Sequence, residues 1–394
     1  MRPDWALLAP HRPLDPGSEN YVRPPWSAGD DIAERVMAGS PIILVGGPAG
    51  AGKSTELARA ATVLRDKGDR VACLAPVDLW ENMRKLTPDQ LLLRIAGRLA
   101  YVAEVQFHFG LSNTARSGLA QAGVYHEPKM MLMMMPFEGS PVSLVRAVIA
   151  EVLRLSGQRQ ITLLIDGMEK VADPAASADL FEALAGLADS AEIVAVVPWN
   201  ITYRRHDDNV IRPGERWAIV SPGIVEGVEG APTRAFLRGI VAKRLGFEVD
   251  LLDPSASGMH FGARLLGEDV VPTSFVELVE RAAVSSGGLA RVFLQLVADA
   301  GTYARLRRDG DWPDSEDLVD AESDMEDSFR RALQPGDTDA VLKAVGTDGR
   351  ELELDRKVRL LARGILLERR NGTGVQMEIH PLARRVIKGG APHA

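Results

Sequence analysis

The sequence has a single cysteine and lacks any long apolar run. Cys73 has no second cysteine with which to form an internal disulfide. No apolar stretch reaches the roughly 18 residues that a membrane-spanning helix needs. The first twenty residues contain no apolar core of a secretory signal peptide. Together these absences predict a cytoplasmic protein that makes no contact with a membrane.

The sequence also lacks an excess of basic residues. It contains 46 Lys and Arg against 54 Asp and Glu, a formal net charge of −8. Because proteins that coat nucleic acid are usually basic, the charge of the whole chain argues against that role, although a local basic patch is compatible with it. No internal repeat of solenoid or propeller type is present. Apolar residues make up 46% of the 394, which is enough for the cores of two or three domains.

Residues 41–225 alternate between β-type and helical patterns. Short apolar, β-rich runs occupy 41–47, 69–79, 161–166 and 192–199, with a further candidate at 215–223. Helical patterns occupy 54–68, 87–105, 143–157 and 177–189, and 107–141 is expected to be an irregular insertion. This alternation predicts an α/β fold in which helices cover both faces of a parallel sheet.

After about residue 225 the β-type runs stop, and the pattern predicts an all-α lid. Helices are expected over 231–246, 272–288 and 289–308, and the acid-rich stretch 309–327 is expected to be a solvated helix face or a linker. From 336 onward, two helical patterns precede β-like runs around Asn371-Gly372, which predicts a winged helix. The expected domains are a Pro-rich lead with a first helix (1–40), an α/β domain (41–225), a helical lid (226–335) and a winged helix (336–394).

The stretch GGPAGAGKST, residues 46–55, matches the P-loop pattern G-x-x-x-x-G-K-[ST] without deviation. A predicted strand precedes it and a predicted helix follows it, as a P-loop requires. Backbone N–H groups of such a loop surround a β-phosphate, and the helix N-terminus adds its positive dipole end. We expect Lys53 to reach the β- and γ-phosphates and the Ser54 hydroxyl to ligate Mg²⁺. The predicted nucleotide-binding residues here are Gly47, Pro48, Ala49, Gly50, Ala51, Gly52, Lys53, Ser54 and Thr55.

An acid at the end of a neighbouring strand completes a P-loop site. The run ITLLIDGMEK places Asp166 in that position, and we expect its carboxylate to hold Mg²⁺ together with Ser54. Glu169 is a candidate for orienting the attacking water, the alternative being a simple exposed acid. The sequence has no N-K-x-D stretch of the kind that reads guanine, so the predicted nucleotide is ATP or ADP.

Beyond the P-loop, three segments resemble the STAND branch of the AAA-like ATPases, the signal-transducing switches that include NB-ARC and NACHT proteins. ITLLIDGMEK (161–170) is similar to the Walker B strand of that family. SSGGLARVFLQL (285–296) is similar to its lid segment, in which a Gly-Gly turn opens a helix against the nucleotide. VQMEIHPLARRVI (375–387) is similar to the end of its winged helix. The resemblance covers about residues 21–387, with Lys170 where many members have a second acid and Ala290 where many lids have proline.

The resemblance implies a slow ATPase that works as a switch. It assigns Arg291 to a sensor 2-like contact with the γ-phosphate and His380 to a contact with the β-phosphate of the ADP state. The alternatives are a surface charge and a structural histidine. Because the sequence shows neither the effector domain nor the repeat-built sensor of a full-length STAND protein, we expect a separate effector protein as partner. A homo-oligomer is compatible with the same reading.

Other signals are less specific. In PWNITYRR (198–205), after the fourth strand, the candidates for orienting water are Asn200 and Thr202 and the candidates for contacting phosphate are Arg204 and Arg205; a polar strand end is an equal alternative. Candidate arginine fingers for a neighbouring subunit are Arg212 and Arg216. The Met-rich run KMMLMMMPF (129–137) is interpreted as core filling, with a partner-binding patch as the alternative.

The sequence is compatible with three functions. The first is the ATP-dependent switch, for which a role in bacterial conflict or phage defence rests on family analogy alone. The second is a DNA-acting ATPase, since residues 336–394 carry eleven Lys and Arg against eight Asp and Glu. In the switch family, however, the winged helix packs against the nucleotide domain, which makes nucleic acid the less favoured partner. The third, a small-molecule kinase, is disfavoured because the pattern indicates no acceptor pocket.

Overall fold

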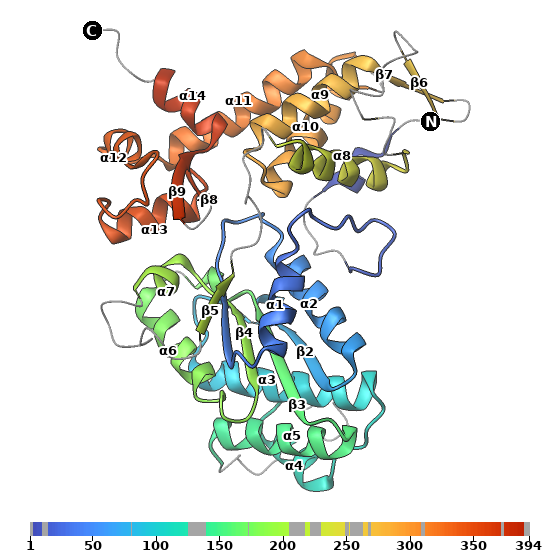
Figure 1. Cartoon of the computed structure of the whole chain (residues 1–394), viewed down its shortest axis with the longest axis vertical. Coiled ribbons are helices and arrows are strands. Elements are labelled where there is room, and N and C mark those ends of the chain that lie inside the picture. Colours follow the sequence, from blue (N-terminus) through green and yellow to red (C-terminus); the bar gives the residue numbers. More distant parts are fainter. Residues whose placement is uncertain are drawn as a thin grey trace. The chain divides into compact units, whose positions relative to one another are not determined.

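A computed structural model gives the fold of the chain (Figure 1). It describes residues 3–9, 15–79, 81–124, 139–171, 173–204, 217–220, 230–248, 252, 263–266, 269–308, 312–371 and 374–389. The chain forms two compact units. We call Ala28–Gly46 with Glu56–Ser221 the sheet unit, and Met1–Ser27 with Gly47–Thr55 and Pro222–Ala394 the lid unit. The four domains expected from the sequence remain a prediction.

The sheet unit is built on five parallel strands in the order β2-β3-β4-β1-β5. Their bounds are β1 (Ile42–Val45), β2 (Arg70–Pro76), β3 (Gln160–Asp166), β4 (Glu192–Val196) and β5 (Trp217–Val220). These are the five strands expected from the sequence. Short runs of β-branched and apolar residues form such strands because a parallel sheet is buried on both faces.

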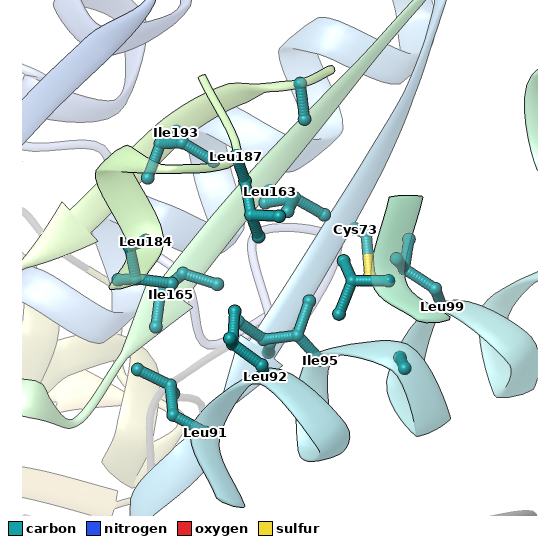
Figure 2. Packing of buried hydrophobic residues seen from close by; sticks show 14 of the residues in the cluster. Cys73, Leu91, Leu92, Ile95, Leu99, Leu163, Ile165, Leu184, Leu187 and Ile193 are labelled. Carbon is teal, nitrogen blue, oxygen red and sulfur yellow. The ribbon is translucent and has the colours of Figure 1, made fainter. Parts of the chain in front are cut away.

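Helices cover both faces of this sheet, as predicted (Figure 1). Side chains alternate along β1: Ile43 and Val45 pack with α1 and α2, whereas Ile42 and Leu44 belong to the cluster that includes α3, α5 and α6. Figure 2 shows the second cluster, in which Leu92 and Ile95 of α3 lie near Leu163 and Ile165 of β3. The helices are α1 (Ala28–Met37), α2 (Lys53–Lys67), α3 (Pro88–Tyr101), α4 (Asn113–Gln121), α5 (Pro141–Ser156), α6 (Pro174–Ala185) and α7 (Trp199–Arg204).

The region 107–141 is not irregular throughout, which corrects the expectation. It contains α4, which begins after Ser112, whose hydroxyl accepts a hydrogen bond from the Ala115 N–H at 3.3 Å. Leu119 of this helix is buried in the cluster shared with α3 and α5. The serine cap and the four-residue spacing of Ala115 and Leu119 were readable signals, but a nine-residue helix gives too few repeats to stand out. The Met-rich run 129–137 lies outside the described residues.

The first part of the lid unit is mainly helical. Its helices are α8 (Ala231–Leu245), α9 (Thr273–Ser285), α10 (Ala290–Arg308) and α11 (Ser315–Ala332). The expectation that strands stop after residue 225 is wrong, because β6 (Ala263–Leu266) and β7 (Asp269–Pro272) pair as an antiparallel hairpin. Strands of four residues carry too short an alternation to be recognised, and cross-strand pairing decides them instead. Most of the acid-rich stretch 309–327 lies in α11, which Asp314 caps.

The end of the lid unit is a winged helix, as predicted. It consists of α12 (Asp337–Ala344), α13 (Leu354–Ala362), β8 (Leu366–Asn371), β9 (Gly374–Ile379) and α14 (Pro381–Gly389). β8 and β9 are antiparallel, and Asn371 pairs with Gly374, so the hairpin turns where the Asn-Gly signal placed it.

The chain's N-terminal segment is part of the lid unit rather than a free lead. A short 3₁₀ helix, η1 (Trp5–Leu8), buries the Trp5 ring 5.6 Å from the Phe275 ring. Arg305 of α10 donates a hydrogen bond to the Pro3 carbonyl at 2.6 Å. Gly301 of α10 leaves the space for the indole, because a Cβ there would lie 2.4 Å from Trp5 Cδ2.

Replacing Gly301 by alanine should therefore displace Trp5 and destabilise the lid unit by about 1–3 kcal/mol, the usual cost of overpacking. Urea unfolding followed by tryptophan fluorescence measures this change. Gly389→Ala is the control, because a Cβ at that position meets nothing within 4 Å. Equal midpoints for the wild type and the Gly301→Ala variant would show that Trp5 is not held in this place.

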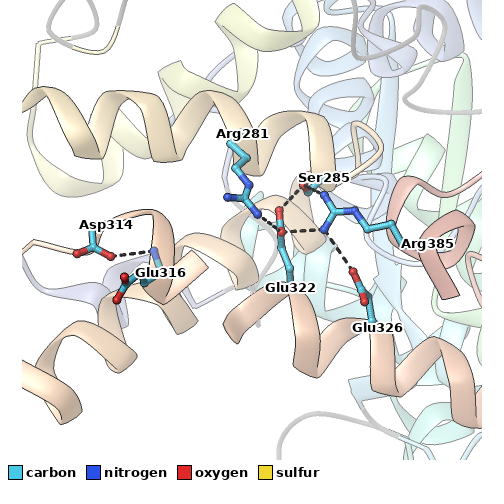
Figure 3. A network of polar contacts seen from close by, with 7 residues as sticks. All are labelled: Arg281, Ser285, Asp314, Glu316, Glu322, Glu326 and Arg385. Atoms are coloured by element: carbon cyan, nitrogen blue, oxygen red, sulfur yellow. Dashed lines mark hydrogen bonds and ion pairs between the residues drawn. The ribbon is translucent and has the colours of Figure 1, made fainter. Parts of the chain in front are cut away.

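A buried carboxylate joins the lid helices to the winged helix (Figure 3). Glu322 of α11 accepts hydrogen bonds from Ser285 at 2.5 Å, Arg281 at 2.6 Å and Arg385 at 2.8 Å. Burial alone would raise the pKa of Glu322, but the hydrogen bonds from Arg385, Ser285 and Arg281 together lower it. The carboxylate thus stays ionised, and it ties α9, α11 and α14 together.

Candidate functional site

The P-loop follows β1 and leads directly into α2, as the motif requires. Gly50 has a φ of 86°, a left-handed conformation that residues with a Cβ rarely adopt. The Ala51 N–H donates to the Pro48 carbonyl at 3.3 Å, which closes the loop. Gly52 likewise has a φ of 87°, so glycine is needed at these two positions of the loop for its backbone conformation.

Lys53 opens α2 and is buried, with 5% of its surface exposed. Its Nζ donates to the carbonyl oxygens of Gly47 and Pro48, each at 3.0 Å. The ammonium group is thus held over the loop by two backbone acceptors. Ser54 and Thr55 follow in the first turn and are half-buried, whereas Ala49 is exposed. A phosphate in this loop would meet the ammonium group and the N-terminal end of α2 together.

The structure brings Arg291 to the P-loop. Its backbone N–H donates to the Gly50 carbonyl at 3.3 Å, and its Cβ lies 2.5 Å from where a Cβ on Gly50 would stand. The preceding glycines, Gly287 and Gly288, have φ of 61° and 81°, so a turn opens α10 as the Gly-Gly signal predicted. The Arg291 side chain is exposed. Gly50 is therefore needed both for its φ and for this close approach.

The winged helix also meets the P-loop. Leu289 and Leu367 form a small buried cluster, and Ala51 and Val292 pack against it. The P-loop, the start of α10 and strand β8 thus share one apolar contact within the lid unit.

His380 lies where β9 passes into α14 and has no exposed surface. Its Nδ1 accepts a hydrogen bond from the Leu382 N–H at 3.3 Å, and its ring centroid lies 4.8 Å from that of Phe329. Burial lowers the pKa of His380 to about 4, and the nearby Arg369 cation adds to this, partly opposed by the Ser286 backbone. Its ring also borders the Gly-Gly turn, with Cδ2 3.3 Å from where a Cβ on Gly287 would stand.

The pKa of His380 makes stability depend on pH. Between its ordinary value of 6.5 and about 4, the unfolded chain binds a proton at this ring and the folded chain does not. Stability is therefore unaffected above pH 6.5 and falls by about 3 kcal/mol as the pH drops to 4. Urea unfolding across this range measures the loss, and His380→Asn should flatten the slope because the amide does not titrate. An unchanged slope in that variant would assign the acid sensitivity to other groups.

In the sheet unit, Asp166 ends β3 and is buried, with 6% of its surface exposed. Its Oδ1 accepts a hydrogen bond from the Gly167 N–H at 3.0 Å. Gly167 has a φ of 94°, and a Cβ there would lie 2.5 Å from Asp78 Oδ1. Asp78 follows β2 and forms an ion pair with Lys170. Sequence reasoning missed Asp78, although an acid just after a buried strand was a readable signal.

The other predicted residues of the sheet unit have different surroundings. Glu169 is half-buried in the 3₁₀ turn Met168–Lys170. The Asn200 amide donates to Ser177 Oγ at 2.8 Å, so it is tied to α6. Thr202 Oγ1 lies 3.1 Å from where a Cβ on Gly46 would stand, and within the described residues this buried hydroxyl has no hydrogen-bond partner. Arg204 ends α7, whereas Arg205, Arg212 and Arg216 lie outside the described residues.

Several basic side chains of the winged helix bind partners within the winged helix itself. Arg359 makes a bidentate pair with Asp337, at 2.7 and 2.8 Å, and Arg356 lies 3.6 Å from the same carboxylate. Lys357 is buried and donates to the Asp348 carbonyl. Arg369 is also buried, so it does not contribute to an exposed basic surface. Exposed basic residues in the described part of this region are Lys343, Arg350, Arg363, Arg384, Arg385 and Lys388, of which Arg385 pairs with Glu322.

None of the helices among the described residues is long and apolar enough to cross a bilayer. No group of three or more His, Cys, Asp or Glu side chains in the same residues is placed to hold a metal ion.

Comparison with known proteins shows a similar fold in a solved structure but does not assign the chain to a family. The chain matches no family model and no curated protein. It is similar to the Walker-type ATPase PABY2304 of Pyrococcus abyssi, with a TM-score of 0.52 and 12% identity over 94% of this chain and 100% of that chain.

Two other solved structures are less similar. Cdc6p of Pyrobaculum aerophilum has a TM-score of 0.44 and 14% identity over 98% of each chain. The Orc1 protein of Aeropyrum pernix, solved with DNA, has a TM-score of 0.42 and 15% identity over 98% of this chain and 96% of that chain. With its P-loop, parallel sheet, lid and winged helix, the chain has the fold of a P-loop NTPase that carries a helical lid and a winged helix.

Proposed function

We propose that this protein binds and hydrolyses ATP and uses the nucleotide to change the arrangement of its lid and winged helix. The observation that carries the proposal is the P-loop itself, with Lys53 buried over the loop carbonyls and Arg291 docked on Gly50. In the proposal, residues 47–55 hold the phosphates, and Lys53 neutralises the charge that develops on them. The absence of an N-K-x-D stretch supports adenine as the base.

The chemistry of the donors suits Mg²⁺. Ser54 offers a hydroxyl in the first turn of α2, and Asp166 offers a buried carboxylate at the end of β3. Mg²⁺ prefers such oxygen ligands and usually takes only one or two of them from the protein, with phosphates and water completing its shell. When bound, the ion would neutralise phosphate charge. In the same proposal, Glu169 orients the attacking water. The left-handed backbone conformation of Gly167 makes the turn between Asp166 and Glu169.

The lid and winged helix supply the means to read the nucleotide. We propose that the Arg291 side chain binds the γ-phosphate, since its backbone is already anchored at the P-loop. His380 would report on the ADP state through the Gly287 turn, which it borders. The switch requires two arrangements of the lid and winged helix in equilibrium. ATP or ADP shifts that equilibrium only if it binds one arrangement more tightly than the other. Self-association and a separate effector protein are part of this switch hypothesis, and a defence role rests on family resemblance alone.

A DNA-acting ATPase is the second candidate, and the winged helix is the observation that favours it. Such a protein would contact phosphates through the exposed basic residues named above, so duplex binding should weaken with salt. Charge reversal of Arg363 and Lys388 should then abolish binding, with charge reversal of Arg35 in the sheet unit as control. Absence of duplex binding at low salt would remove this candidate.

The test of the proposed activity is phosphate release from ATP. We expect slow turnover in the presence of Mg²⁺, reduced about 100-fold in Asp166→Asn, which keeps the size of the side chain and removes its charge. Turnover by Asp166→Asn at the wild-type rate would contradict the role of this residue.

A further inference from the structure

Arg369 is a buried cation beside the P-loop contact. It lies on β8 two residues after Leu367, so both side chains leave the same face of the strand. Leu367 belongs to the cluster on which Ala51 of the P-loop packs. Arg369 Nη2 donates to the Gly287 carbonyl at 3.2 Å, which places the guanidinium at the turn that precedes Arg291.

The hydrogen bonds of this guanidinium are incomplete. Its side chain is 6% exposed, and Nε donates to Glu378 at 2.8 Å. Nη1 is buried and has no hydrogen-bond partner among the residues that the structure describes. Arginine stays protonated in proteins, so these N–H donors keep their charge. A buried, charged donor without an acceptor has lost its hydration without compensation, and a well-placed anion would offset that cost.

Phosphate is the anion that this position suits. The planar fork of arginine matches phosphate oxygens, and a guanidinium loses less on desolvation than an ammonium. Glu378 does not complete the pairing, because its recorded contact is with Nε and not with Nη1. The P-loop, which the proposed function assigns to phosphate binding, reaches the same region through Ala51, which packs against the cluster of Leu289 and Leu367.

We propose that Arg369 is a phosphate-binding residue, whose Nη1 binds a phosphate group of the nucleotide held in the P-loop. The inference rests on the proposed function and adds a direct link between nucleotide and winged helix. His380 Nε2 is also buried and has no hydrogen-bond partner among the described residues, but burial lowers the pKa of His380 to about 4, so the neutral ring offers an anion no charge. Binding through Arg369 would fix β8, and with it the winged helix, against the P-loop.

The test compares binding of ATP, ADP, pyrophosphate and adenosine by equilibrium titration. Arg369→Met, which keeps the length of the stem and removes the charge, should weaken ATP, ADP and pyrophosphate by about 10–100-fold. Adenosine, which has no phosphate, should bind the variant and the wild type equally. Glu378→Gln is the matched control: it removes the other charge of the pair and should change every affinity less than about threefold.

The outcomes separate this inference from the function on which it rests. Wild-type affinity for ATP and pyrophosphate in a folded Arg369→Met variant overturns the inference, as does an equal loss for adenosine. If that variant does not fold, Arg369→Gln repeats the comparison, since its amide can still donate to Gly287. If the wild type itself binds no ATP, the proposed function fails; if it binds ATP and only Arg369 proves indifferent, the proposed function stands alone.

Discussion

Lys53→Ala is expected to lower ATP turnover by at least about 100-fold and to weaken ATP binding strongly. The Lys53 ammonium is the buried cation of the P-loop, held by the carbonyls of Gly47 and Pro48. In a site with little water it would meet the β- and γ-phosphates with small reorganisation, where electrostatic contacts are strongest. A 100-fold loss corresponds to about 2.7 kcal/mol of transition-state stabilisation. Phosphate release and titration with a fluorescent ATP analogue measure the two effects.

Lys67→Ala is the matched control, because Lys67 lies at the other end of the same helix and is exposed. It removes the same charge and should leave binding and turnover within about twofold of the wild type. In the absence of nucleotide, both variants should unfold at the wild-type urea midpoint or close to that midpoint. Normal turnover by a folded Lys53→Ala variant would contradict the assignment of the P-loop as the site.

Glu322→Ala is expected to destabilise the lid unit by about 3–5 kcal/mol, the usual cost of breaking a buried ion pair. The change leaves Ser285 without its acceptor and removes the shared partner of Arg281 and Arg385. Arg281 and Arg385 are 41% and 47% exposed, so water can hydrate them when the carboxylate is removed. We therefore expect a destabilisation at the lower end of this range. Urea unfolding with hydrogen exchange on α9, α11 and α14 measures the loss (Figure 3).

Glu326→Ala is the control for this prediction, because it removes a second carboxylate that pairs with Arg385, one helical turn after Glu322. Glu326 lies on the same helix, is more exposed, and contacts only Arg385 within the network of Figure 3, at 3.3 Å. This substitution should cost less than about 1 kcal/mol. If Glu322→Ala and Glu326→Ala cost the same, then burial of the Glu322 carboxylate does not determine the strength of the network.

Local sequence signals predicted most of the fold. A P-loop has specific residues at fixed spacing and lies between a strand and a helix. The motif GGPAGAGKST therefore supported the prediction of a strand before it and a helix after it. Thr87 and Gln90 form the capping box that starts α3, at the first residue of the predicted helical pattern 87–105. The misses were the short elements α4, β6 and β7, whose few residues carry weak periodicity and which depend on tertiary contacts.

The candidate site was harder to predict, because its parts meet through the fold. Arg291 was found by the Gly-Gly turn beside it, and the structure does place that turn at the P-loop. Nothing in the sequence distinguished Arg369 from Arg370, since burial on one face of β8 depends on the partner strand and lid. Asp78 could have been found as an acid that follows a buried strand, but its proximity to Gly167 comes from the pairing of β2 with β3 and could not be predicted.

Calorimetric titration of the wild-type chain with ATP and with ADP, each with Mg²⁺, decides whether the protein is a nucleotide-dependent switch. We expect one nucleotide bound per chain and different affinities for ATP and ADP, because only such a difference can drive a rearrangement of lid and winged helix. Equal affinities would leave an ATP-binding protein without a switch. No heat and no binding of either nucleotide at millimolar concentration would contradict nucleotide binding itself.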